Sequence, residues 1–240
     1  MVRVPSAEAE DRRRITRERK VLITERTRHI NRIKGLLFGQ GITGYEPIRR
    51  DRREQLEELR TGDGRPISQH LKAQIDRELD RFELLMDQIK AVEAERNSLV
   101  TAEANNTPAT MLMCLKGIGP EFAAILHSEG LFRHFDNRRQ VAAYAGLAPT
   151  PWQSGSVSHE QGVCKAGNVR LRTTMVELAW LWLRNQPESA LARWFHQRVE
   201  RNGGRLRKPM IVARARKLLI ALWKYVTAGV AIDGAVLKTT

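Results

Sequence analysis

Cysteine and aromatic residues are scarce in this sequence, and long hydrophobic runs are absent. The 240 residues include 2 cysteines, Cys114 and Cys164, too few for a disulfide framework or a cysteine-rich metal site. The 6 histidines show no ligand spacing, so no metal site is expected in this chain. No apolar run approaches the ~18 residues of a membrane span, and the first residues lack the apolar core of a secretion signal. We therefore expect a cytoplasmic protein that does not enter a membrane.

Positive charge is what the sequence has in excess. Lys and Arg number 41 against 27 Asp and Glu, which gives a formal net charge of +14 and a pI near 10.5. Hydrophobic residues make up 42%, which is typical of a chain that folds around a core. A strongly basic folded protein predicts a polyanionic partner, with nucleic acid as the first expectation and an anionic membrane as the lesser one.

The first third of the chain predicts two long helices. Residues 6–38 keep a loose helical period with Ser6 as N-cap, and Arg and Lys crowd the remaining faces. Those cations are read either as nucleic-acid contacts or as a solvated face. From Ile67 to about Val100 the apolar residues alternate spacings of four and three, which is a coiled-coil seam. The seam consists of Ile75, Leu79, Phe82, Met86 and Ile89. It must pack on the first helix, on a second copy of the chain, or on both.

The remainder predicts a compact helical domain. Asn105–Pro108 divides a helical and coiled-coil region (residues 1–104) from a C-terminal domain (residues 108–240). Asp136 is expected to cap a helix, and further helices are expected from about residue 168, over 189–200 and from residue 209. Residues 148–156 contain Pro149 and Pro151 and predict an irregular loop. No convincing strand pattern occurs, so the predicted fold class is all-α.

A glycine hairpin stands at residues 117–119, between two short apolar segments. Gly117 and Gly119 would let a phosphate approach the backbone, Pro120 suits the first turn of a helix, and Lys116 adds a cation. The pattern resembles the helix-hairpin-helix motif, which binds nucleic-acid backbone. An ordinary helix-to-helix turn fits the same residues.

The second candidate site is a basic loop that leads into a helix. Lys165, Asn168, Arg170 and Arg172 place a helix cap among three cations, which suits a phosphate and equally suits a solvated helix entrance. Upstream, Ser154 stands beside Gly155 in the proline-rich loop, where a serine could attack a phosphodiester if its proton were removed. Two nearby loop serines, Ser156 and Ser158, compete with it for that role, and Trp152 is the aromatic residue expected to stack on a base.

Three blocks in fixed order resemble the transposases of the insertion-sequence-110 group, whose C-terminal domain is shared with insertion sequences 116 and 902. The blocks are GIGPEFAAIL (residues 117–126), VAAYAGLAPTPWQSG (141–155) and GVCKAGNVRLR (162–172). The segment ERTRHINRIKGLLFGQGI (25–42) is similar to the family's middle region. The resemblance implies a mobile-element protein that recombines DNA under the direction of a guide (bridge) RNA, with Ser154 as the nucleophile.

The resemblance also implies an N-terminal RuvC-like domain that holds Mg²⁺ through four acidic residues. No such residues precede residue 6, so we expect a truncated member that needs no cofactor in this chain and is defective alone. We expect DNA, a guide RNA and a second copy of the chain as partners, in the bacterial nucleoid. The alternative is a non-catalytic nucleic-acid-binding and oligomerisation fragment that modulates full-length transposase. A third reading is a base-excision enzyme that uses Asp136.

Overall fold

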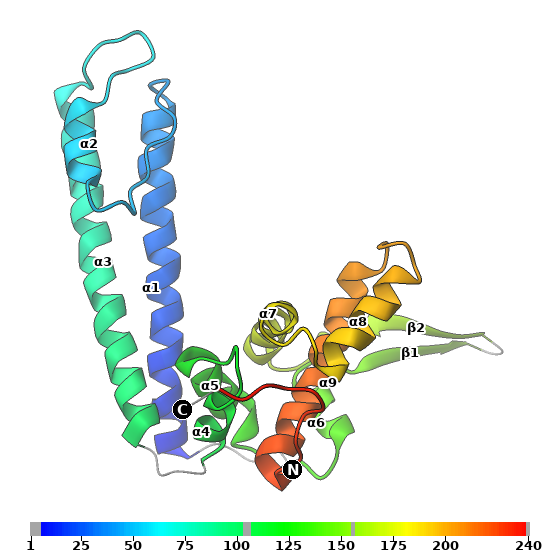
Figure 1. Cartoon of the computed structure of the whole chain (residues 1–240). Coiled ribbons are helices and arrows are strands. Elements are labelled where there is room, and N and C mark those ends of the chain that lie inside the picture. Colours follow the sequence, from blue (N-terminus) through cyan, green and yellow to red (C-terminus); the bar gives the residue numbers. More distant parts are fainter. Residues whose placement is uncertain (1–5, 103–106, 155–156, 239–240) are drawn as a thin grey trace. The chain divides into compact units, whose positions relative to one another are not determined.

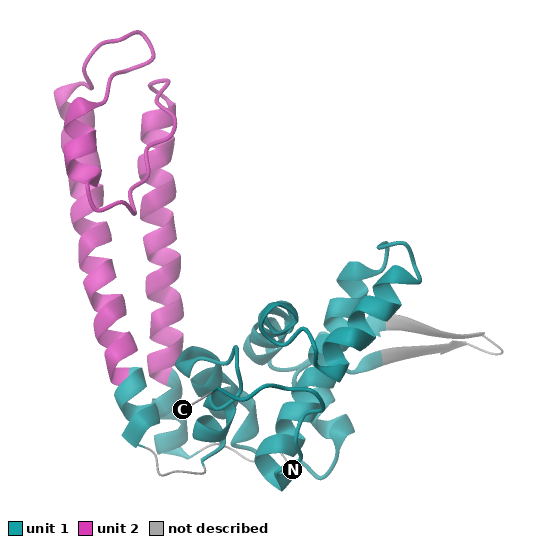
Figure 2. Cartoon of the chain, viewed as in Figure 1, with its two compact units in different colours: residues 1–13, 96–240 teal, residues 14–95 magenta. Residues whose placement is uncertain are grey.

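The chain divides into two compact units. The computed structural model describes residues 6–102, 107–154 and 157–238, with the backbone alone for 150–154 and 157–161. Unit 1 comprises residues 1–13 and 96–240, and unit 2 comprises residues 14–95 (Figure 2). Each unit is considered by itself. The predicted division into residues 1–104 and 108–240 stays a prediction.

Unit 2 is a helical hairpin with a short third helix. It contains most of α1 (Ala7–Phe38) and α3 (Gln69–Ala102), together with α2 (Arg52–Glu58) (Figure 1). The predicted seam is buried except at Met86, which is partly exposed, and Ile75 and Leu79 share one apolar cluster with Ile33 and Leu37 of α1. A second cluster joins Leu22 of α1 to α3, through Leu85, Ile89 and Val92. The first helix of the same chain is therefore a packing partner of the seam, while a second copy stays a prediction.

A buried carboxylate links the two long helices of unit 2. The Glu78 side chain is 4% exposed and lies 2.5 Å from Nδ1 of His29. Arg32 and Arg81 place Nη1 atoms 3.0 Å and 2.7 Å from Oε1 of Glu78. Burial alone would raise the pKa of Glu78, but hydrogen bonds from His29 and Arg32 outweigh burial and hold the pKa below its ordinary value. The carboxylate is therefore ionised at neutral pH, and it joins α1 to α3 through charge.

Unit 1 is built from short and medium helices around one core. Its helices are α4 (Pro108–Met113), α5 (Pro120–Leu126), the π-helix η1 (His127–Leu131), α6 (Arg138–Tyr144), α7 (Val169–Asn185), α8 (Ala190–Glu200) and α9 (Arg207–Ala228). The core includes Leu178 and Trp182 from α7 and Leu218 and Leu222 from α9, each no more than 1% exposed. The predicted all-α class is confirmed. Among the described helices, none is long and apolar enough to cross a membrane.

Helix caps fall at several predicted positions, and one prediction was wrong. The Asn168 side chain accepts a hydrogen bond from the Leu171 N–H, and Ser189 likewise caps α8. Asp136 does not cap α6, because Asn137 takes that position and accepts from two backbone N–H groups of the first turn. The Asp136 carboxylate instead accepts a hydrogen bond from Gln140 Nε2 at 2.9 Å. The two residues are adjacent and both are good caps, so sequence alone did not separate them.

The irregular loop predicted over residues 148–156 was also wrong. Strand β1 (Pro149–Ser154) pairs antiparallel with β2 (Val157–Val163), and the register joins Pro149 to Val163 and Ser154 to Val157. The register shifts between Pro149 and Pro151. Proline is tolerated there because a two-stranded sheet consists of edge strands alone, so a missing N–H need not break a ladder. The hairpin is the exception to an otherwise helical unit.

We expect Glu78→Gln to destabilise unit 2 by about 1–3 kcal/mol at neutral pH, because the variant loses the charge that holds three partners. The lowered pKa also fixes the sign of the pH dependence. The contribution of Glu78 is complete above the unfolded pKa of about 4.3 and is lost as pH falls through the lower folded pKa. The difference between wild type and variant should therefore shrink below about pH 4.

The measurement is thermal unfolding of the whole chain between pH 3 and pH 7. Asp87→Asn is the matched control, because Asp87 is 75% exposed and pairs with Lys90 within one turn. A difference between Glu78→Gln and wild type that stays constant over the whole pH range would contradict the assignment.

Candidate nucleic-acid-binding site

The predicted glycine hairpin joins α4 to α5, and packing explains its first glycine. Gly117 has φ +93°, and a Cβ there would lie 2.7 Å from Cβ of Asn185 at the end of α7. No other residue fits that position without displacing α7. Gly119 has open space around it, and Pro120 begins α5 as predicted. Lys116 is exposed.

A buried glutamine ties this hairpin to the C-terminal segment. Gln186 is 1% exposed, and its Nε2 donates to the carbonyls of Lys116 and Val236 at 2.8 Å each. Its Oε1 accepts the Val236 N–H at 2.7 Å. The Lys116 N–H donates to Val236, and the Ile118 N–H donates to Leu115. Two hairpin amides are thus engaged within the protein, and the phosphate-binding role of the hairpin stays a prediction.

At the second predicted site, two backbone segments that are distant in sequence lie in close contact. The Asn168 N–H donates to the Tyr144 carbonyl at 2.8 Å, which brings the entrance of α7 against the end of α6. A Cβ on Gly167 would lie 2.6 Å from the backbone N of Gly146, and Gly146 itself has φ +64°. We call this contact the glycine crossing. It fixes where the β-hairpin leaves the body of unit 1, because the hairpin spans the chain between the two glycines.

Two of the predicted phosphate ligands face a buried carboxylate. Asn168 donates from Nδ2 to Glu129 Oε2 at 3.0 Å, in addition to capping α7. Arg170 Nε lies 3.7 Å from Glu129 Oε1, and the two side chains are 15% and 4% exposed. Glu129 belongs to η1, and no sequence motif marked it as a partner. Asn168 and Arg170 therefore stabilise the joint between η1 and α7.

Arg172 also contacts the backbone at the glycine crossing. Its Nη1 donates to the Lys165 carbonyl at 2.7 Å, and a Cβ on Gly146 would lie 2.5 Å from the same nitrogen. The Lys165 side chain is exposed. The structure thus brings Lys165, Asn168 and Arg172 to one joint, while Lys116 lies on the hairpin between α4 and α5.

Ser154 is the last residue of β1, where the register pairs it with Val157. Pro149 begins the strand, and at about 3.3 Å per residue the two ends are about 17 Å apart. Gly155 and Ser156 lie outside the described residues, and the side chains of Ser154 and Ser158 are not described. The backbone therefore carries the predicted nucleophile along a strand, away from the glycine crossing.

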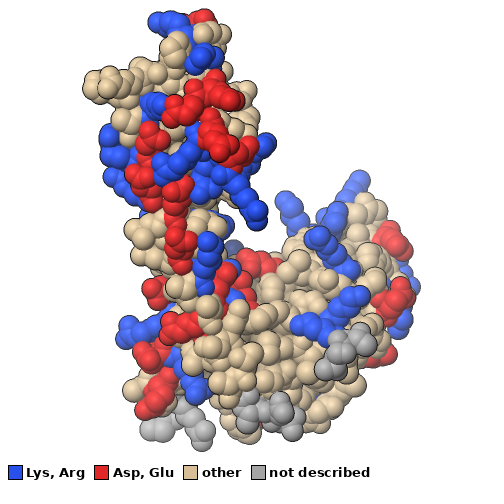
Figure 3. All heavy atoms as spheres, turned by 60° about the vertical axis from the view of Figure 1, so that its left-hand side comes forward, with Lys and Arg blue, Asp and Glu red and all other residues tan. Residues whose placement is uncertain are grey.

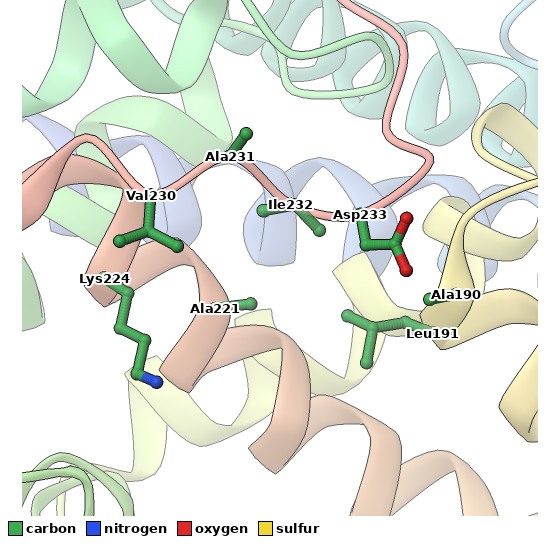
Figure 4. A pocket seen from close by; sticks show the side chains of 8 residues that line it. All are labelled: Ala190, Leu191, Ala221, Lys224, Val230, Ala231, Ile232 and Asp233. Atoms are coloured by element: carbon green, nitrogen blue, oxygen red, sulfur yellow. The ribbon is translucent and has the colours of Figure 1, made fainter.

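Two further features bear on a candidate enzyme site, namely metal ligands and cavities. No group of three or more His, Cys, Asp or Glu side chains in the described part of the chain could hold a metal ion. The Mg²⁺ implied by the resemblance does not fit these residues, and no metal-dependent step is derived. A cavity of about 200 Å³ lies between α8, α9 and the C-terminal segment. Apolar side chains line it, with Lys224 and Asp233 at opposite sides (Figure 4). It contains no nucleophile.

We expect Gln186→Leu to destabilise unit 1 by about 2–4 kcal/mol, because the variant removes the partner of the Lys116 carbonyl and of the Val236 N–H, and one of the two donors to the Val236 carbonyl. The measurement is the free energy of unfolding of the whole chain in urea. Gln197→Leu is the matched control, since Gln197 is exposed on α8. Equal stability of the two variants would show that the buried glutamine does not hold the hairpin.

Gly167→Ala should destabilise unit 1 by more than about 2 kcal/mol, because its methyl group would overlap backbone atoms that cannot move independently. Gly162→Ala separates this overlap from backbone strain, since Gly162 has φ +79° and open space around it. We expect about 1 kcal/mol for that control. Urea unfolding of both variants makes the comparison, and equal losses would contradict a steric crossing.

The comparisons with known proteins converge on one family. Residues 109–194 match the model described as "Transposase IS116/IS110/IS902 family", a stretch that runs from α4 into α8. A putative transposase of Sinorhizobium fredii, y4rJ, is 68% identical over all of this chain and 63% of its own length. A probable family 20 transposase of Pseudomonas aeruginosa is 28% identical over 92% of this chain and 65% of its own length.

A transposase for insertion sequence element IS1111A of Coxiella burnetii is 25% identical over 92% of this chain and 60% of its own length. The chain thus spans about three-fifths of the length of these relatives. The predicted resemblance is confirmed. By sequence, residues 109–194 match the IS116/IS110/IS902 family of transposases, and the chain as a whole is similar to transposases.

Proposed function

We propose that this chain acts in DNA transposition, where unit 1 binds DNA and the β-hairpin presents Ser154 to a phosphodiester. One observation carries the proposal: the segment that matches the transposase family contains both the hairpin and the glycine crossing from which it extends. The backbone contacts at the glycine crossing fix where the β-hairpin starts on unit 1, and therefore where a residue of the hairpin lies relative to that unit. Such positioning favours attack on a substrate held by the same unit.

The proposed step is a transesterification. Ser154 Oγ forms a bond to phosphorus, the bond from phosphorus to one DNA oxygen breaks, and the DNA is left joined through phosphoserine. The hydroxyl proton passes to water, and the leaving DNA oxygen takes up a proton from water. One phosphoester replaces another, so rejoining the DNA to a new end needs no outside source of energy.

DNA is the first proposed partner, and the net charge of +14 supports it. The family resemblance adds a guide RNA as a proposed partner, and the coiled-coil seam of residues 75–89 adds a second copy of the chain. By the same resemblance, Mg²⁺ would act with the four acidic residues of an N-terminal RuvC-like domain, and not with residues of this chain.

The alternative proposal is a non-catalytic nucleic-acid-binding protein that modulates transposase. Its support is that Asn168 and Arg170, two predicted ligands close to Ser154 in the sequence, make contacts inside the protein. In that case the hairpin serves as a binding element, and Ser154 has no chemical role.

A covalent trapping assay separates the two proposals. The whole chain is incubated with labelled duplexes covering the DNA on both sides of its coding sequence, RNA transcribed from the same region, and Mg²⁺. Because we expect this chain to be defective alone, we expect only a weak protein–DNA adduct on a denaturing gel, and Ser154→Ala should reduce it by at least about a hundredfold. Ser156→Ala and Ser158→Ala are matched controls and should retain it. An adduct that survives Ser154→Ala contradicts the nucleophile, and binding without any adduct favours the alternative.

A further inference from the structure

The connection between α8 and α9 gathers exposed cations on a tight turn. We call residues 198–208 the α8–α9 corner. Gly203 and Gly204 have φ +55° and +80°, and nothing lies within 4 Å of the position a Cβ would take on either. These left-handed conformations reverse the chain and bring the end of α8 beside the start of α9. The basic residues of the corner are Arg198, Arg201, Arg205, Arg207 and Lys208, all exposed.

These cations lack acidic partners. Within the described part of the chain, none of the five forms a salt bridge, and Glu200 is the one acidic residue of the corner. In unit 2, by contrast, Arg53 contacts both Asp80 and Glu83. Basic and acidic side chains are intermixed over much of the face drawn in Figure 3, so total charge does not locate a binding surface. A cluster of cations without acidic partners is a better indicator of a surface that binds an anion.

A further cation lies buried on the same helix. Arg214 is 0% exposed, and none of its three side-chain nitrogens has a hydrogen-bond partner in the described structure. Burial lowers the pKa of Arg214 to about 10, so the group stays charged at neutral pH. It follows Arg207 by two helical turns, which is about 10 Å. Its uncompensated charge adds to the positive potential of the corner.

Two aromatic rings connect the buried cation to the exposed one. Arg207 Cζ lies 5.2 Å from the centroid of Trp180, and Arg214 Cζ lies 5.6 Å from that of Phe195. The two rings meet edge to face, with centroids 6.2 Å apart. A guanidinium stacked on a ring keeps its charge and its donors available at its edge. Arg207 is therefore held in place by a ring and not by a carboxylate that an anion would have to displace.

We propose that the α8–α9 corner binds the phosphodiester backbone of a nucleic acid. Phosphates spaced along a polymer can contact several of these cations at once, and the two glycines leave room for close approach. Leu206, 38% exposed, is a single partly exposed apolar group, too little to anchor the corner in a membrane. The inference rests on the proposed function for the choice of partner, and adds a surface that the sequence-predicted ligands did not include.

The test compares two triple variants with equal charge loss. The corner variant carries Arg201→Gln, Arg205→Gln and Lys208→Gln. The matched control removes three exposed cations that each pair with an aspartate, through Arg49→Gln, Arg65→Gln and Lys90→Gln. Fluorescence anisotropy measures binding of the whole chain to a 20-base-pair DNA duplex, the corresponding single strand and an RNA duplex, from 50 to 200 mM salt.

We expect the corner variant to weaken binding to at least one of these probes by about 10- to 100-fold at 100 mM salt. The slope of log K against log salt for duplex DNA should fall by up to about 3, and the control should change binding by less than about threefold. The probe with the largest loss identifies the nucleic acid. Equal effects in both triple variants, or no effect on any probe, would overturn the proposal.

Failure of this inference differs from failure of the proposed function. The covalent assay depends on Ser154, while the salt dependence depends on the corner, which lies outside the hairpin. A normal adduct with an unchanged salt slope rejects the corner alone. A reduced slope in the corner variant, together with an adduct that survives Ser154→Ala, rejects the nucleophile alone. Equal thermal midpoints of the two triple variants exclude misfolding as the cause of weaker binding.

Discussion

The candidate site depends on one steric constraint, the contact between the backbones of Gly146 and Gly167. A side chain on Gly167 would overlap backbone atoms of Gly146 and Tyr144. Because the chain crosses itself here without side chains, α6 ends and α7 begins at one point, and Asn168 can cap α7 while it bonds to Glu129. The β-hairpin is the chain between the two glycines. Its position on unit 1 therefore follows from a contact that contains no functional group.

The basic residues of the chain divide by what they contact. In unit 2, Arg32 and Arg53 contact acidic side chains, and hydrogen bonds from His29 and Arg32 hold the pKa of Glu78 below its ordinary value. At the glycine crossing, Arg170 and Arg172 bind a carboxylate and a carbonyl inside the protein. In the described structure, the basic side chains of the α8–α9 corner contact neither a carboxylate nor a carbonyl. A net charge of +14 is therefore a poor guide to where an anion binds, because similar residues do structural work elsewhere.

The sequence predicted the parts of the fold that local rules determine. Helical periodicity placed α1 and α3, and cap chemistry placed Asn168 at the start of α7. The β-hairpin escaped prediction because its prolines argue against a strand, a rule that weakens when both strands are edges. The contacts of Gln186 with Lys116 and Val236 escaped because they join residues 70 and 50 positions apart. No local pattern marks such partners, and Glu129 was missed for the same reason.

The candidate site was predicted least completely, and the reason bears on mechanism. Lys165, Arg170 and Arg172 follow Ser154 closely in the sequence, and cations near the serine would stabilise the charge that develops when it attacks. The strand separates Ser154 from the crossing by about 17 Å, which is beyond the Debye length of about 8 Å at physiological salt. Cations at the crossing thus contribute little at the serine. If Ser154 attacks DNA, the stabilising charge must come from groups brought to the end of the hairpin, by other parts of the chain, by a partner or by the nucleic acid's own ions. Holding DNA and cutting it would then be tasks of different surfaces, which is why a salt-dependence measurement and a covalent trap can give independent answers.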